Sequence, residues 1–337
     1  MGKGISLSGE ELAILKGILD GINTVIGNYG WSIVVFTLLL RIVLFPFDYK
    51  SRVSMRKTTK LQPQLAALQK KYANDKEKLN RKMSELYKKE KINPLSSCLP
   101  MLLTLPILFA MWTALRIIAN EQMVSQVFTI LQGQTPTMEG WLWVKNLWMP
   151  DSPFAAAWPD LNSLQLIPAD IWQNAYNALI AQGVTLPAEI TYDFAGNLQG
   201  TIQAIYAYME KMPEYVTATS NVPGWSFNLL LTQVDLKTMY NGFFILPILA
   251  AVTQYLMTVL QPTQPTGTEN QQAAGTGNFM KWFFPLFSLF ICSSYNAAFS
   301  LYWVMGNIIA AVQNIGINWY LDNKEKREAA IGEGTVK

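Results

Sequence analysis

The chain has no histidine among its 337 residues, and it has only two cysteines. Without histidine, Ser-His-Asp and Cys-His catalysis are excluded, and so are histidine-ligated zinc and haem sites. Cys98 and Cys292 lie far apart, each inside an apolar run, which excludes a disulfide framework and a Cys-only metal site. We interpret the two thiols as small core hydrophobes, and no metal or other cofactor is expected.

Charged residues and nucleotide-binding motifs are scarce as well. Only 15% of the residues are charged and 50% are apolar, whereas an average soluble domain is about 25% charged. No GxxxxGK[ST] motif is present, HExxH is impossible without histidine, and no pair of aspartates lies inside an apolar run. The sequence therefore predicts an all-α integral membrane protein that is not an enzyme.

Five apolar runs each have close to the ~20 residues needed to cross a bilayer as a helix. The expected spans are 24–48, 98–119, 240–260, 279–298 and 299–321. The last two are almost contiguous and together too long for one crossing, so they are expected to fold back with a turn in Ser293–Ala297.

Two long loops have opposite charge, which predicts the orientation. Residues 49–97 contain 14 Lys/Arg and 4 Asp/Glu, whereas residues 120–240 contain 3 and 10. Short cytoplasmic loops are rich in Lys and Arg, so 49–97 is expected inside and 120–239 outside. Alternation then places a flexible loop, 261–278, and the tail, 322–337, inside. The N-terminal segment, 1–23, is expected to be amphipathic, uncleaved and on the outer interface.

The basic loop 49–97 has the apolar spacing of two helices. One stripe consists of Leu61, Leu65, Leu68 and Tyr72, and the other begins with Leu79 and Met83. Asn74 and Asp75 lie between them and resemble a turn that caps the second helix. We predict a cytoplasmic helical hairpin whose stripes pack on each other, on lipid headgroups or on a partner. Residues 165–235 outside are compatible with a small, mostly helical domain.

Arg41 is the sharpest functional candidate, because it lies within the run Leu38–Leu44. A charge at the bilayer centre costs about 3 kcal/mol on insertion scales. One interpretation is that Arg41 extends to the cytoplasmic headgroups, although Lys50 is nine residues further along, about 13 Å on a helix. The functional interpretation is that Arg41 faces a water-filled cavity open to the cytosol, since no acidic residue lies in the middle of a span.

Polar residues in the other spans favour the second interpretation. The proposed groove residues beside Arg41 are Thr104, Gln254, Asn307 and Gln313. Each alone is more typical of a hydrogen bond between membrane helices than of a binding site. Together with a lone arginine they indicate a polar groove.

Several motifs resemble those of YidC-type membrane protein insertases. They include Asn93-Pro94-Leu95 through Leu103, the single arginine of the first span seven residues before Asp48, Leu147-Trp148-Met149-Pro150-Asp151, Leu246-Pro247-Ile248 with Thr253-Gln254-Tyr255, and Leu301-Tyr302-Trp303 with Gly306, Asn307 and Gln313. They occur in the family order over about two thirds of the chain. The outer stretch 160–235 is longer than the family pattern leads us to expect between these two spans.

This resemblance implies five transmembrane helices around a hydrophilic groove, with Arg41 as its central residue and the hairpin as an arm that receives substrates. It implies an insertase of the bacterial plasma membrane, and the loop charges predict that its N-terminus lies outside and its C-terminus inside. The expected partners are nascent membrane proteins, the ribosome, the Sec translocon and membrane lipids, with no specific nucleic acid and a monomer as the active form. The alternatives are an anion-selective transporter or channel, and a passive assembly factor for membrane complexes.

Overall fold

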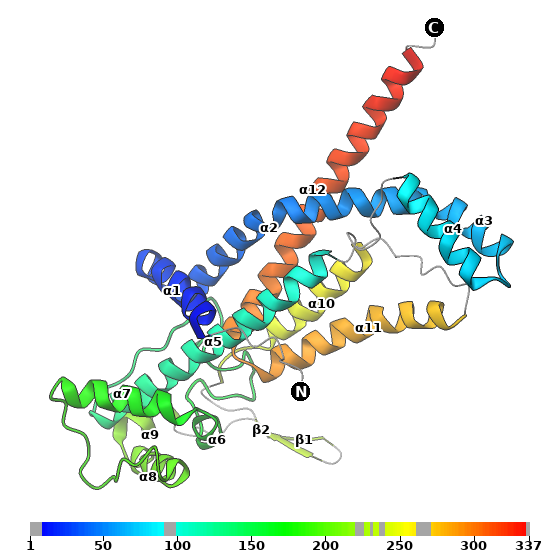
Figure 1. Ribbon diagram of the computed structural model, residues 1–337. Coiled ribbons are helices and arrows are strands. Elements are labelled where there is room, and N and C mark those ends of the chain that lie inside the picture. Colours follow the sequence, from blue (N-terminus) through cyan, green and yellow to red (C-terminus); the bar gives the residue numbers. More distant parts are fainter. Residues whose placement is uncertain are drawn as a thin grey trace. The chain divides into compact units, whose positions relative to one another are not determined.

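The computed structural model describes residues 9–90, 99–219, 226–229, 232–235, 240–260 and 271–334. Helices dominate this part of the chain, as predicted (Figure 1). The exception is an antiparallel pair of short strands, β1 (Ser226–Leu229) and β2 (Thr232–Asp235), in which Ser226 pairs with Asp235. The prediction of a helical protein is therefore correct, but it did not include this small pair of strands.

The helices follow one another with few extended segments between them. They are α1 (Gly9–Ile26), α2 (Tyr29–Lys60), α3 (Gln62–Lys71), α4 (Lys76–Lys89), α5 (Leu99–Leu131), α6 (Leu161–Gln165), α7 (Ala169–Ala181), α8 (Leu198–Met209), α9 (Pro213–Thr219), α10 (Ile245–Leu260), α11 (Gln271–Ser294) and α12 (Ala297–Gly334).

Several helices extend beyond the apolar runs from which they were predicted. Helix α2 continues past residue 48 to Lys60, α5 continues past residue 119 to Leu131, and α12 continues into the tail expected from residue 322. Lys, Arg, Gln and Glu are good helix formers, so a helix need not end where its apolar run ends. The break between α11 and α12 falls at Tyr295 and Asn296, inside the range expected for the turn.

By length and composition, two described helices could cross a membrane, at Tyr29–Lys60 and Ala297–Glu328. Shorter apolar helices occupy Ile245–Leu260 and Lys281–Ser294. Cys98, the first part of the Asn93–Leu103 motif and most of the loop 261–278 lie outside the described residues.

The chain divides into two compact units. Unit 1 consists of Met1–Phe36, Ala110–Ala250 and Leu289–Trp303, and unit 2 consists of Thr37–Phe109, Ala251–Ser288 and Val304–Lys337.

In unit 1, a glycine and an asparagine separate α1 from α2. Gly27 has φ +73° and its N–H bonds to the Asn23 carbonyl, which is the usual way for a glycine to end a helix. The Asn28 side chain then accepts the N–H of Trp31 at 3.2 Å. This N-cap starts α2 in a new direction.

Residues 139–151, which we call the capping segment, bind the first turns of several helices in unit 1. The Glu139 carboxylate accepts the N–H of Tyr29 at the start of α2, at 2.9 Å. The buried Asp151 carboxylate accepts the N–H groups of Phe244 and Leu246 at the start of α10, at 3.2 and 2.7 Å. The first N–H groups of a helix have no partner within the helix, so these carboxylates stabilise the N-terminal ends of α2 and α10.

The same segment also holds the start of α12. The N–H groups of Ala297 and Ala298 donate to the carbonyls of Met149 and Leu147, each at 2.9 Å. The buried Asn241 amide donates to the carbonyls of Asn146, Met149 and Pro150, which keeps the segment folded. Unit 1 is therefore organised around a polar segment rather than around apolar contacts alone.

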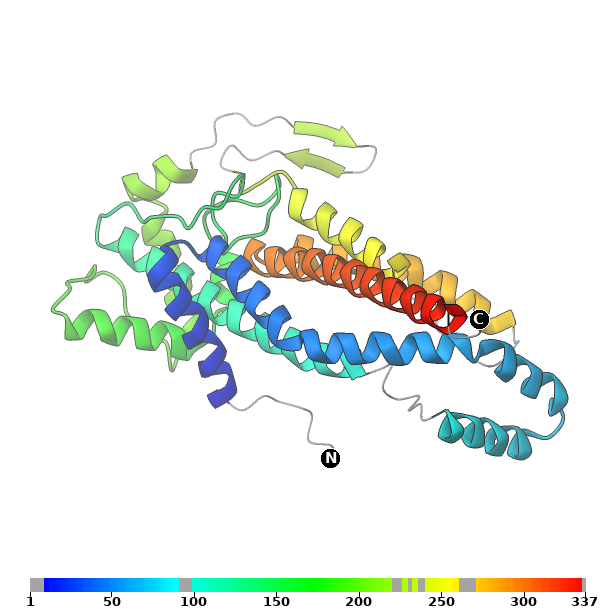
Figure 2. The ribbon, with the colours of Figure 1, turned by 90° about the horizontal axis from the view of Figure 1, so that it is seen from above.

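Unit 2 contains the short hairpin of α3 and α4 and parts of the long helices. Leu61 and Leu65 are buried, and Met83, Leu86 and Tyr87 pack against them. Asp75 caps α4 by accepting the N–H of Lys78 at 2.9 Å. The hairpin follows directly from the end of α2 (Figure 2).

Candidate functional site

The candidate site lies in unit 2, where α2, α10 and α12 contribute polar side chains to a common seam. Arg41 is in the apolar part of α2, and its side chain is partly buried. The Gln313 amide of α12 donates to the Arg41 carbonyl at 3.0 Å. Two of the predicted groove residues are therefore in direct contact, although the contact is through the Arg41 backbone.

The Arg41 side chain lies beside Gly306 of α12. A Cβ placed on Gly306 of α12 would lie 3.6 Å from Nη2 of Arg41 and 4.0 Å from Cγ2 of Thr37. These are ordinary contact distances, so the guanidinium lies directly against the α12 backbone. Within the described residues no carboxylate forms an ion pair with Arg41, and Asp48, two turns along α2, acts on it only at longer range.

Asn307 joins α12 to α10. Its amide donates to Oε1 of Gln254 at 3.1 Å and to Oγ1 of Thr253 at 3.3 Å. Two further predicted groove residues are thus paired. Thr104 lies on α5 in the same unit and is partly buried. It has an interaction of its own, but it does not take part in the hydrogen bonds described above.

Arg52 is a seam residue that the sequence analysis missed. Its side chain is only 7% exposed, and its Nε donates to Oδ1 of Asn314 at 3.0 Å. Its Nη1 is buried without a hydrogen-bond partner. A buried guanidinium with an unpaired nitrogen is unusual, because an unsatisfied charged donor carries a large desolvation cost.

Towards their later residues, α2 and α12 are joined by ion pairs. Arg56 contacts Asp322 at 2.7 Å and donates to the Asn318 carbonyl at 2.9 Å. Lys60 contacts Glu325 at 3.0 Å. The signal was present in the sequence: cations at 52, 56 and 60 and polar residues at 314, 318, 322 and 325 recur at helical spacing.

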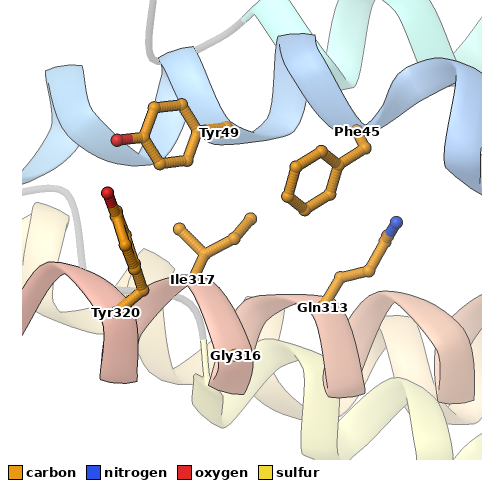
Figure 3. A pocket seen from close by; sticks show the side chains of 6 residues that line it. All are labelled: Phe45, Tyr49, Gln313, Gly316, Ile317 and Tyr320. Atoms are coloured by element: carbon orange, nitrogen blue, oxygen red, sulfur yellow. The ribbon is translucent and has the colours of Figure 1, made fainter.

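A pocket of about 550 Å³ lies beside the seam between α2 and α12 (Figure 3). Phe45 and Tyr49 of α2 face Ile317 and Tyr320 of α12 across it, and Gln313 lies at one end. The Tyr49 and Tyr320 ring centroids are 6.4 Å apart. The lining is mostly apolar, with the Gln313 amide and the hydroxyls of Tyr49 and Tyr320 as its polar groups, which suits an apolar side chain or acyl chain.

The predicted hairpin residues lie apart from the seam residues along the chain, on α3, on the two residues that flank α3, and on α4. Leu61 and Leu65 form the packed face, whereas Leu68, Tyr72, Leu79 and Met83 are partly buried. The ammonium groups of Lys71 and Lys78 lie 5.7 and 5.8 Å from the Tyr72 ring centroid. The hairpin surface is consequently basic around a short apolar stripe.

Comparison with known proteins identifies the family. The profile described as 60Kd inner membrane protein matches residues 21–325. Three similar proteins are each named membrane protein insertase YidC: those of Campylobacter jejuni (48% identical over 97 residues), Fusobacterium nucleatum (48% over 99) and Ruegeria pomeroyi (48% over 95).

These alignments cover 29%, 29% and 28% of this chain and 18%, 48% and 16% of the respective relatives. The chain thus spans less than half the length of the curated relatives it matches. The family profile, in contrast, covers most of the chain. The resemblance found in the sequence motifs is confirmed, and the chain belongs to the 60Kd inner membrane protein family of YidC-type insertases.

Proposed function

We propose that this chain is a membrane protein insertase, without enzymatic chemistry, that moves short hydrophilic tails across the bilayer and releases the apolar span into lipid. The observation that carries the proposal is Arg41, a partly buried cation in the apolar part of α2 that has no ion-pair partner among the described residues. An unpaired cation at that position is available to attract an acidic substrate segment.

The mechanism follows from the costs of crossing hydrocarbon. Each polar group transferred without a hydrogen bond costs several kcal/mol. A groove in which Arg41, Gln254, Asn307 and Gln313 offer charge and amide groups would shorten the dry part of the path. Burial of the substrate's apolar span, at about 25 cal/mol per Å², would drive insertion without nucleotide hydrolysis.

The surrounding arrangement is part of the same proposal. Five spans enclose the groove, the N-terminus lies outside and the hairpin of α3 and α4 lies in the cytoplasm. Nascent membrane proteins are the substrates, and the ribosome and the Sec translocon are partners of the basic cytoplasmic side. The basic hairpin surface also attracts anionic headgroups. The insertase acts as a monomer.

The test measures insertion of a single-span reporter with an acidic tail into proteoliposomes, scored by protease protection of the tail. Arg41→Ala should reduce insertion on the order of tenfold, because one charge-assisted interaction contributes roughly 1.5–3 kcal/mol. Arg41→Lys should retain part of the activity, and a reporter with a neutral tail should be little affected. Val43→Ala, at a 67% exposed position on the same helix, is the matched control.

Gly306 provides a second set of variants that keep the arginine. Gly306→Ala should retain insertion, because its Cβ would meet Arg41 at an ordinary distance. Gly306→Leu should impair insertion of the acidic reporter by displacing the guanidinium. Normal insertion by folded Arg41→Ala and Gly306→Leu proteins would contradict the role of the charge.

Two further results would favour the alternative functions. Passage of anions without reporter insertion would favour a channel. Crosslinking of stalled nascent chains from positions 41 and 254 would separate an insertase from a passive assembly factor.

A further inference from the structure

At the tip of the capping segment in unit 1, Leu142 adopts a backbone conformation that is unfavourable for leucine. Trp141 and Val144 exchange two backbone hydrogen bonds of 2.9 Å, so Leu142 and Trp143 form a two-residue hairpin turn. Leu142 has φ +50°. The first central position of such turns favours Gly, Asn or Asp, and leucine is poorly suited to a left-handed backbone.

The Leu142 side chain receives little compensation from the rest of the chain, because it is 65% exposed. Contact of this apolar side chain with water provides no free energy to offset the strain in the Leu142 backbone. Lipid offers the apolar contact that the chain itself does not provide.

The turn is held against the first turn of α2. The Trp141 ring packs directly on Gly30, where any Cβ would overlap it, and it meets the Trp31 ring edge-on at 5.7 Å. The Asn28 amide donates to the Gly140 carbonyl at 2.9 Å. These contacts set the position of Leu142 along the α2 axis.

That position coincides with the beginning of the apolar part of α2. The α2 helix is long and apolar enough to cross a membrane, and its apolar run begins at Ile33, two residues after Trp31. Trp31 is 49% exposed, and tryptophan is enriched at the boundary between lipid and water. Leu142 and Trp31 therefore both expose apolar surface at the level where the apolar run of α2 begins.

We propose that Leu142 inserts into the leaflet at the Tyr29 end of α2 and anchors the capping segment to the bilayer. The occupant of this surface is lipid, at the level where headgroups meet acyl chains. Lipid contact compensates for the strained turn, and the anchor fixes the depth of the segment that caps α2, α10 and α12.

The test uses the full chain, with both cysteines replaced by alanine, in vesicles of phosphatidylethanolamine and phosphatidylglycerol. A nitroxide is attached to Leu142→Cys, and its collision with oxygen and with a water-soluble nickel complex is measured. The references are Val43→Cys, in the exposed apolar part of α2, and Gln182→Cys, at an exposed polar position. Position 142 should favour oxygen, as position 43 does. A ratio equal to that at position 182 would overturn the proposal.

A second pair of variants avoids the label. Leu142→Asn and Leu142→Asp both tolerate the backbone of the turn and have the same shape, and only Asp adds a charge. In vesicles the Asp variant should unfold at a lower temperature than the Asn variant, whereas a tip in water predicts nearly equal midpoints. Equal midpoints in folded proteins would overturn the proposal.

Discussion

At the scale of single residues, Arg41 and Arg52 differ although they share one helix. Arg41 is flanked by apolar residues in the sequence, which made it a candidate at once. Arg52 lies in the basic stretch that follows and resembles a solvated cation, yet it is 7% exposed and bonded to Asn314. The difference depends on α12, because only a neighbouring helix can bury a side chain whose own sequence surroundings are polar.

The Arg52–Asn314 contact should behave as a coupled pair. Asn314→Leu should lower the free energy of unfolding by about 2–3 kcal/mol, because it leaves a second nitrogen of a buried guanidinium unpaired. Arg52→Met should cost less, and the double variant should recover part of the loss. Thermal unfolding in detergent micelles measures all three. Val312→Ala, at an exposed position on the same helix, serves as the control, and simple additivity of the two losses would show that the residues are not coupled.

At the scale of elements, the large loop contains helices with their own aromatic core. In unit 1, Trp172 of α7 stacks on Phe194 at 5.7 Å, and Tyr176 stacks on Tyr192 at 4.9 Å. The sequence suggested a small helical domain here, but the weak periodicity did not show which aromatics meet. Stacking of rings from α7 on rings of the following loop is a tertiary contact that periodicity does not encode.

This aromatic core predicts a loss of stability in alkali. Burial raises the pKa of Tyr192 to about 12 from 10.0, with the nearby Tyr176, Tyr208 and Glu189 acting in the same direction. Because the unfolded phenol loses its proton first, the contribution of Tyr192 is complete below pH 10 and is lost as the pH rises towards 12. Tyr192→Phe should therefore show a shallower fall in unfolding temperature over this range. Parallel pH curves for the two proteins would argue against the assignment.

At the scale of the whole molecule, charge distribution predicts the orientation in the membrane. The basic hairpin and the acidic large loop should lie on opposite sides. In a cysteine-free background, Ala73→Cys in the α3–α4 turn should react with an impermeant maleimide only from the cytoplasmic side. Gln182→Cys after α7 should react only from outside. Reaction of both from the same side would contradict the proposed topology of five spans.

The sequence by itself determined that this is a helical protein of an insertase family in the inner membrane, and it singled out Arg41. Composition, apolar run length and motif order are properties of the sequence itself, and they can be read without knowing how the helices pack. Only the tertiary structure decided that Asn307 pairs with Gln254, that Asn314 pairs with Arg52 and that Glu139 and Asp151 cap distant helices. Such pairings depend on the rotation and offset of one helix against another, and these are set by long-range contacts that no periodicity within a single helix specifies.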